Sequence, residues 1–230
     1  MDRFAQLALV ASREAYADSG LERDKLTLER CGVIVGTGMG GLAELEEQHL
    51  RLLDKGPSKV SAFTIPKLMA NAAVGHISIE FGFRGVNAAV ATACASAGNA
   101  MADAVNAIRR NELDVVMTGG SEAALTPLGL AAFAAMKALS VRNDNPPVAS
   151  RPFDKDRDGF LLSEGAGLLV FEELEHAKKR GARIYAEVLG IAATADANDM
   201  VQPDPVGAGA SRAMRNALAD ARINPDEIDY

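Results

Sequence analysis

The stretch Val86-Asn-Ala-Ala-Val-Ala-Thr-Ala-Cys-Ala-Ser-Ala-Gly-Asn-Ala100 decides how this chain folds. Its first part, Val86 to Ala91, is a short, largely apolar run that predicts a buried strand. Its second part opens a segment, Ser96 to Arg110, whose apolar residues recur at helical spacing. A turn of small residues, Thr92 to Ala95, joins the two. Cys94 therefore lies where a strand ends and a helix begins.

Cys94 has two possible roles. The unsatisfied backbone N–H groups at a helix N-terminus favour an anion and so stabilise a thiolate there. The small residues around Cys94 leave room for a substrate to reach the sulfur. A lone cysteine can instead serve as a small buried hydrophobic residue. The position between strand and helix favours the nucleophile.

Composition limits the class of protein. With 230 residues, 48% of them hydrophobic, the chain suits one large α/β domain or part of a larger one. A net charge of −7 argues against binding to nucleic acid or to an anionic membrane surface. The two cysteines show no spacing pattern, so we expect reduced thiols. We find no targeting segment and no apolar run long enough to span a membrane, and we expect a soluble, cytoplasmic protein.

Strand and helix patterns alternate along the chain, which predicts a mostly parallel sheet covered by helices on both faces. Besides the central stretch, the expected strands are residues 31–36, 113–118, 165–172 and 184–193, with another beginning at 228–230. The expected helices are residues 3–19, 64–81, 127–139, 173–180 and 208–221.

Two motifs imitate ligand sites. Gly36-Thr-Gly-Met-Gly-Gly41 follows a strand with the glycine spacing of a dinucleotide-binding turn. The next segment contains Glu44, Glu46 and Glu47, which would repel a pyrophosphate, and no acidic residue ends a second strand about 20 positions on. We expect these glycines to let the backbone pass close to another segment instead.

The second motif, Asp154-Lys-Asp-Arg-Asp-Gly159, resembles the start of a calcium loop, but Gly165 stands where the loop needs Glu. We interpret it as a charged structural loop. His76 lies among apolar residues, and we expect a core histidine with its hydrogen bonds satisfied rather than a catalyst.

Several motifs occur together in one order: the Gly36–Gly41 loop, Thr92-Ala-Cys-Ala-Ser-Ala-Gly98, Gly119-Gly-Ser-Glu122 and Arg151-Pro-Phe-Asp through Glu164-Gly-Ala-Gly167. With them the chain resembles the β-ketoacyl-[acyl carrier protein] synthases, and most closely the type II elongating form. The resemblance implies the α/β thiolase-like fold, in which two similar halves pack as five layers, αβαβα. Residues 1–181 would be most of the first half, without its first strand, and residues 182–230 the beginning of the second.

The resemblance also implies residue roles. Cys94 matches the nucleophile that accepts the acyl chain, and its backbone N–H matches one donor of the oxyanion hole. Met39 and Phe133 match positions of the acyl pocket. Lys59 and Lys137 match basic positions that meet the acyl carrier protein, although each alone could be an ordinary solvated lysine.

The implied reaction is decarboxylative condensation of the acyl group on Cys94 with malonyl-[acyl carrier protein], in fatty-acid elongation. It implies no cofactor or metal, substrates carried on phosphopantetheine, and a homodimer in which the strand at 86–91 pairs with its twin. A ketosynthase of polyketide assembly is the close alternative.

The chain departs from the family in two respects. The family's catalytic histidines and lysine and its second oxyanion donor, a phenylalanine, lie in the second half, and none of His49, His76 and His176 matches a catalytic position. Asp199 stands where relatives often have His, near the substrate tunnel, so chain-length preference stays open. We therefore expect an internal fragment, cut at both ends, that does not condense by itself. A non-catalytic interaction unit is the alternative from another class.

Overall fold

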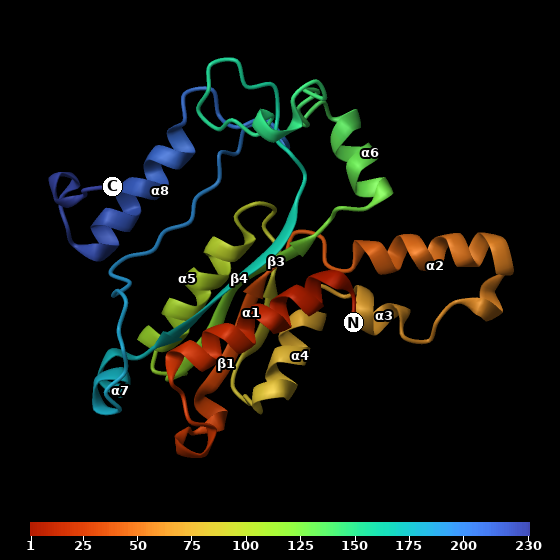
Figure 1. The fold of residues 1–230 in the computed structure, drawn as a ribbon. Helices are drawn as coiled ribbons and strands as arrows, with labels where there is room; N and C mark the ends of the chain where they lie inside the picture. Colours follow the sequence, from red (N-terminus) through yellow and green to blue (C-terminus); the bar gives the residue numbers. More distant parts are fainter.

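The structure is a computed structural model that describes residues 1–230, and its centre is a four-stranded sheet in the order β2-β1-β3-β4 (Figure 1). Strands β1 (Cys31–Gly36), β2 (Asn87–Val90) and β3 (Val115–Ala123) run parallel to one another. Strand β4 (Glu164–Glu172) runs antiparallel to β3. The predicted mostly parallel sheet is confirmed, and three parallel strands bring their carboxyl ends to the same edge.

Helices cover both faces of the sheet, as predicted. Helices α1 (Arg3–Ser19) and α4 (Ala72–Phe81) pack on one face, and α5 (Ser96–Arg109) packs on the other. Alternation along the strands divides their side chains between two cores. One core contains Val33, Val35, Val115 and Met117 together with Phe4 and Ile77. The other contains Ile34 and Val116 together with the alanines of α5.

Asp2 joins the starts of two helices. Its carboxylate accepts hydrogen bonds from the backbone N–H of Phe4, at 3.4 Å, and of Glu44, at 2.8 Å. Phe4 belongs to the first turn of α1, and Glu44 to the first turn of α2 (Leu42–Lys55). A carboxylate at two helix N-termini satisfies free N–H groups and complements both helix dipoles. Asp2 therefore fixes α2 against the layer formed by α1.

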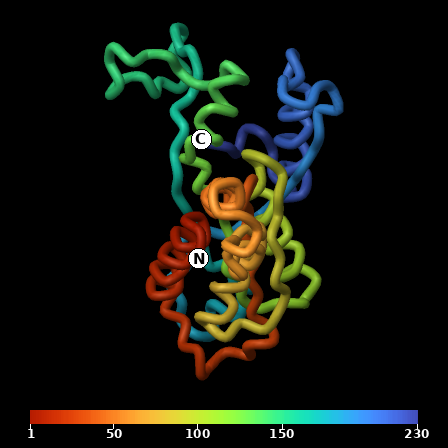
Figure 2. Tube along the Cα trace, turned by 90° about the vertical axis from the view of Figure 1, so that its right-hand side faces the viewer, coloured from red at the N-terminus to blue at the C-terminus, as the bar shows by residue number.

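The remaining helices lie around the ends of the sheet. In Figure 1, α2 and α6 extend beyond the end where β3 finishes, and α7 lies at the opposite end. The α8 region and the segment 136–163 stand beyond the same end as α6 in both Figure 1 and Figure 2. The bounds are α3 (Thr64–Leu68), α6 (Pro127–Ala135), α7 (Leu174–Lys179) and α8 (Ala208–Ala221), with 3₁₀ turns at Arg23–Lys25, Leu28–Arg30, Pro57–Lys59, Pro146–Val148 and Pro225–Glu227.

The single helix predicted over residues 64–81 is wrong, because the structure divides it into α3 and α4. Met69 leaves the helical region with a ψ of 137°. The break leaves the carbonyl of Leu68 free to accept a hydrogen bond from the backbone N–H of Gly41, at 3.0 Å. The end of α3 is thus tied to the glycine loop instead of continuing into α4.

The strand predicted over residues 184–193 is also wrong. The segment has no strand beside it, and without a ladder its backbone groups are satisfied elsewhere. Arg109 donates to the carbonyl of Leu189 at 2.8 Å, and the backbone N–H of Ile191 donates to Asp220 of α8 at 2.8 Å. Residues 228–230 form no strand either, and α6 ends at Ala135, before the predicted 139.

His76 is half-buried on α4 and its imidazole makes no hydrogen bond. The histidine is thus partly in the core, as expected, but the expected hydrogen bonds of its side chain are absent. Burial lowers the pKa of His76 and favours its neutral form. Among the helices, none combines the length and the apolar character that crossing a bilayer requires.

Candidate active site

Cys94 lies at the junction predicted from the sequence. Strand β2 ends at Val90 and α5 begins at Ser96, and Cys94 is exposed in the turn between them. Ala93, just before it, has a φ of 52°, in the left-handed region that a residue with a Cβ rarely adopts. Such a conformation costs about 1–3 kcal/mol and persists only where neighbouring groups hold it.

Ser96 holds this turn. Its buried hydroxyl accepts a hydrogen bond from the backbone N–H of Thr92 at 2.9 Å and donates one to the carbonyl of Ala93 at 2.6 Å. Asn99, one turn further along α5, donates from its side-chain amide to the hydroxyl of Thr92 at 3.0 Å. The left-handed Ala93 is therefore bracketed by side chains of α5, which fixes where Cys94 lies.

The groups of Cys94 itself are free. Neither its thiol nor its backbone N–H makes a hydrogen bond within the chain. No side chain caps the N-terminus of α5, where Ala95 is the N-cap residue. The turn thus combines an accessible sulfur, a free N–H donor and the positive end of a helix dipole. This combination suits a nucleophile that attacks a carbonyl group and stabilises the resulting oxyanion.

The carboxyl ends of β1 and β3 bring further groups to the same edge. The Gly36–Gly41 loop follows β1, and Glu122 lies near the end of β3. The Glu122 carboxylate accepts hydrogen bonds from the backbone N–H of Gly38, at 2.7 Å, and of Met39, at 3.1 Å. A Cβ on Gly38 would lie 3.8 Å from the carbonyl oxygen of Ala93. The loop that contains Met39 therefore lies beside the Cys94 turn.

The glycines allow strands and helix to approach closely, as the sequence predicts. A Cβ on Gly36 would lie 2.2 Å from the carbonyl carbon of Ser96, and one on Gly120 would lie 2.6 Å from the Cβ of Ala97. Gly36 and Gly120 face each other across β1 and β3. Together they make the space in which the first turn of α5 rests against the sheet.

The other predicted site residues lie on different elements. Phe133 is half-buried on α6 and packs edge-on against Phe160, with ring centroids 5.5 Å apart. Lys59 and Lys137 are exposed and form no ion pair. Met39, with 44% of its surface exposed, is the one residue among these four that belongs to the edge containing Cys94.

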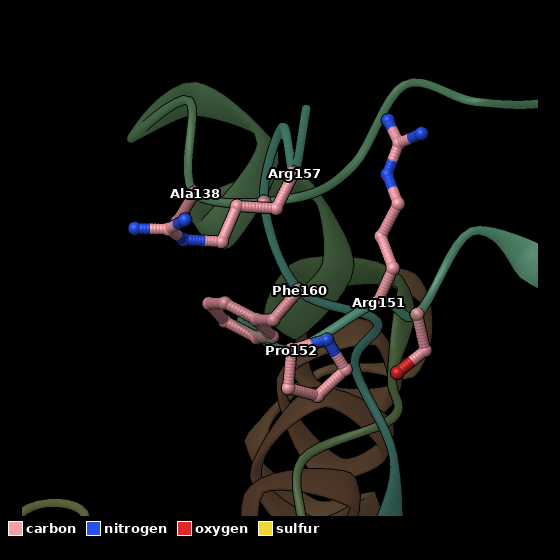
Figure 3. Close-up of a pocket in the computed structure, with 7 residues that line it drawn as sticks. Ala138, Arg151, Pro152, Arg157 and Phe160 are labelled. Carbon is pink, nitrogen blue, oxygen red and sulfur yellow. The ribbon is translucent and has the colours of Figure 1, made fainter. Parts of the chain in front are cut away.

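A cavity of about 470 Å³ is lined by residues of the segment after α6, and Figure 3 shows these residues. Phe160 and Pro152 lie side by side within it, and the guanidinium groups of Arg151 and Arg157 extend to opposite sides. Arg151 donates to Asp158 at 3.2 Å, and Arg157 donates to the carbonyl of Asp154 at 2.8 Å. Arg151 is paired with a carboxylate and Arg157 is bonded to a backbone carbonyl, and the two guanidinium groups diverge, so the cavity does not bring them together on one ligand. These contacts support the interpretation of residues 154–159 as a charged structural loop.

Cys31, the second thiol, differs from Cys94. It is 1% exposed in β1, and its thiol donates to the carbonyl of Thr27 at 3.4 Å. Burial, with a smaller contribution from the charges of Asp114 and Glu172, raises the pKa of Cys31 to about 12. Cys31 therefore stays a thiol across the pH range in which the protein is handled, and an inert one.

We expect iodoacetamide to modify Cys94 much faster than Cys31 at every pH from 6 to 9. The reason is that Cys94 is exposed, whereas Cys31 is both buried and protonated. Peptide mass spectrometry after timed alkylation measures the two rates in one sample, so each cysteine serves as the other's control. Equal rates, or faster modification of Cys31, would contradict the assignment of Cys94 as the reactive thiol.

Comparisons with known proteins bear on the whole chain. The family profile described as Beta-ketoacyl synthase, N-terminal domain, matches residues 1–177, and the corresponding C-terminal domain profile matches residues 185–230. The chain is 48% identical over 230 residues to 3-oxoacyl-[acyl-carrier-protein] synthase 2 of Synechocystis sp., covering all of this chain and 55% of that protein. The enzyme of the same name from Coxiella burnetii is 46% identical over 229 residues, again with 55% of its length covered. The chain therefore spans about half the length of these relatives.

Two solved structures have the same fold. The AntDE:AntF complex, a type II PKS acyl-carrier protein with its ketosynthase bound to the hexaketide, matches with a TM-score of 0.96 and 33% identity, over 99% of this chain and 57% of that chain. A beta-ketoacyl synthase from Burkholderia phymatum matches with a TM-score of 0.90 and 33% identity, over 100% of this chain and 56% of that chain.

Proposed function

Because the chain belongs to the β-ketoacyl synthase family and has its thiolase-like fold, we propose that the protein forms carbon–carbon bonds as a 3-oxoacyl-[acyl carrier protein] synthase. The observation that carries the proposal is the exposed Cys94, with its free backbone N–H, at the N-terminus of α5. We infer that residues 1–181 and 182–230 belong to the two thiolase-like halves.

In the first step, the Cys94 thiolate attacks the thioester carbonyl of the acyl group on its carrier. The negative charge that develops on the carbonyl oxygen is stabilised by the free N–H of Cys94 and the dipole of α5. When the tetrahedral intermediate collapses, the carbon–sulfur bond to the carrier breaks, and the carrier leaves as a thiolate that takes a proton from water. The acyl group is then covalently bound to Cys94.

In the second step, malonyl carrier loses CO₂, and the resulting carbanion attacks the acyl carbonyl on Cys94. A carbon–carbon bond forms, the bond to the Cys94 sulfur breaks, and the thiolate is regenerated. Dividing the reaction in this way replaces one difficult step with two easier ones. No redox step occurs, and the proposal requires no cofactor.

We assign the remaining residues in the same proposal. Met39, beside the Cys94 turn, and Phe133 would line the acyl pocket. The exposed Lys59 and Lys137 would meet the acidic acyl carrier protein, which is the partner of the ketosynthase in one matched structure. The two free thiols fit a cytoplasmic location.

Fatty-acid elongation is the pathway that the relatives favour. The chain is 46–48% identical to enzymes named 3-oxoacyl-[acyl-carrier-protein] synthase 2, and 33% identical to the matched polyketide ketosynthase. A polyketide role remains the second candidate on the strength of that structure's TM-score of 0.96.

The test is an assay for 3-oxoacyl product, with acyl and malonyl groups presented on acyl carrier protein. We expect the 230-residue chain to accept an acyl group but to release no condensed product, because none of its three histidines matches a catalytic histidine of the family. The full-length Synechocystis relative is the positive control. Condensation by the chain at the rate of that relative would show that the catalytic groups are misplaced here.

We also propose a homodimer through β2. This strand is at the open edge of the sheet, and Ala88, Ala89 and Val90 are half-buried, with no charged side chain to protect the edge. Sedimentation of the intact native protein at micromolar concentration should give twice the monomer mass. A monomeric mass would contradict this proposal.

A further inference from the structure

We propose that Glu122 is a positioning residue for acyl transfer, because its carboxylate holds the backbone of Gly38 and Met39 beside the Cys94 turn. This inference rests on the proposed function of Cys94. It assigns a role to a half-buried glutamate that touches the loop rather than the reacting sulfur.

The hydrogen bonds of Glu122 show that it organises the loop. One oxygen, Oε2, accepts from both Gly38 and Met39, while the other accepts from the hydroxyl of Thr37 at 3.4 Å. The Thr37 hydroxyl in turn accepts from the backbone N–H of Gly40 at 3.2 Å. Thr37, Gly38 and Met39 are thus hydrogen-bonded directly to the Glu122 carboxylate, and Gly40 is linked to it through Thr37.

The charge of Glu122 makes these bonds strong. No lysine or arginine pairs with Glu122, so its negative charge is compensated by the N–H and O–H donors of the loop and by the backbone N–H of Ala123, which donates to Oε1 at 3.3 Å. Hydrogen bonds to a carboxylate are roughly twice as strong as those between neutral groups. Glutamine at this position keeps the size of the side chain but loses the charge and replaces one acceptor with a donor.

The loop connects Glu122 to the nucleophile. A Cβ on Gly38 would lie 3.0 Å from Oε2 of Glu122 and 3.8 Å from the carbonyl oxygen of Ala93, so little space separates the three. The same Ala93 carbonyl accepts the hydrogen bond from Ser96 that holds the Cys94 turn. A displaced Gly38–Met39 backbone would therefore alter the space beside Cys94 into which an acyl group must fit.

The test compares two reactions of Cys94 in the intact native protein carrying Glu122→Gln. An acyl N-acetylcysteamine thioester must be oriented by the site, whereas iodoacetamide needs only an accessible thiol. We expect acylation to be about 10- to 100-fold slower than in the wild type, since small misplacements have costs of this order. We expect alkylation to stay within about 3-fold.

Glu173→Gln is the matched control. Glu173 also accepts a hydrogen bond from a backbone N–H, that of His176 at 2.7 Å, but it lies at the start of α7, at the opposite end of the sheet. We expect both reactions of this variant to match the wild type. If Glu122→Gln does not fold, Thr37→Val and Thr37→Ser test the same network, and only the valine variant should lose acylation.

Three results would overturn the proposal: wild-type acylation by Glu122→Gln, wild-type acylation by Thr37→Val, or an equal fall in acylation and alkylation. The last would indicate a general disturbance of the turn. If the wild-type protein itself is not acylated at Cys94, the proposed function fails, and the inference about Glu122 fails with it. This outcome is distinct from the other three, because those compare a variant with a wild-type protein that is acylated.

Discussion

Replacing Cys94 with alanine in the intact native protein is expected to lower the rate of 3-oxoacyl product formation by about 10⁴-fold or more, because removing a covalent nucleophile typically costs this much. The acyl group would have no atom to which it could be transferred. Product is the readout to use, since decarboxylation of malonyl carrier can proceed without the acyl intermediate.

The same substitution should leave the fold unchanged. Cys94 is exposed, its thiol makes no hydrogen bond, and alanine fits a turn already built from small residues. Circular dichroism and the midpoint of urea unfolding provide the check. Residual condensation within 100-fold of wild type would rule out Cys94 as the essential nucleophile.

Gly36→Ala is expected to produce the largest loss of stability among the substitutions considered, about 3 kcal/mol or more of the free energy of unfolding. The new Cβ would lie 2.2 Å from the carbonyl carbon of Ser96 and 2.5 Å from the backbone nitrogen of Ala97. These are backbone atoms, so α5 as a whole would have to move away from β1. Acyl transfer should fall as well, because Cys94 is attached to the start of α5.

Gly98→Ala is the matched control for this prediction. Gly98 is on α5 only two residues after Ser96, but a Cβ there meets nothing within 4 Å. Alanine in a helix is favoured over glycine by roughly 0.5–1 kcal/mol, so this variant should be slightly more stable than the wild type. Equal unfolding midpoints for Gly36→Ala and the wild type would contradict the packing described for β1 and α5.

Local patterns in the sequence correctly predicted the strands that pair within the sheet and the helices that pack against it. The helix over residues 3–19, the strand at 31–36 and the strand–turn–helix around Cys94 formed where periodicity placed them. The segment 184–193 has an equally good strand pattern but no neighbouring strand to pair with. A β pattern describes one strand, whereas a ladder needs two.

Only part of the site was predicted, because local patterns do not show contacts between residues that are far apart in the sequence. The change from strand to helix periodicity located Cys94, and the small residues around it indicated an open turn. The hydrogen bonds that Ser96 and Glu122 make to the Cys94 turn and the glycine loop were missed. Glu122 is 84 residues from Gly38 along the chain, and only the topology of the sheet brings them together. Nothing in the sequence distinguishes Ser96 from other serines. Its hydrogen bond to the carbonyl of Ala93, which helps to hold the left-handed conformation of that residue, is seen only in the structure.

The most direct test of the role of Cys94 is the site of acylation. The intact native protein would be incubated with an acyl thioester of acyl carrier protein, digested under mildly acidic conditions and mapped by mass spectrometry. We predict that the acyl mass is found on the peptide containing Cys94 and is removed by hydroxylamine, as a thioester would be, while the peptide containing Cys31 is unchanged. An acyl group on Cys31, or no acylated peptide under conditions in which product forms, would contradict the role assigned to Cys94.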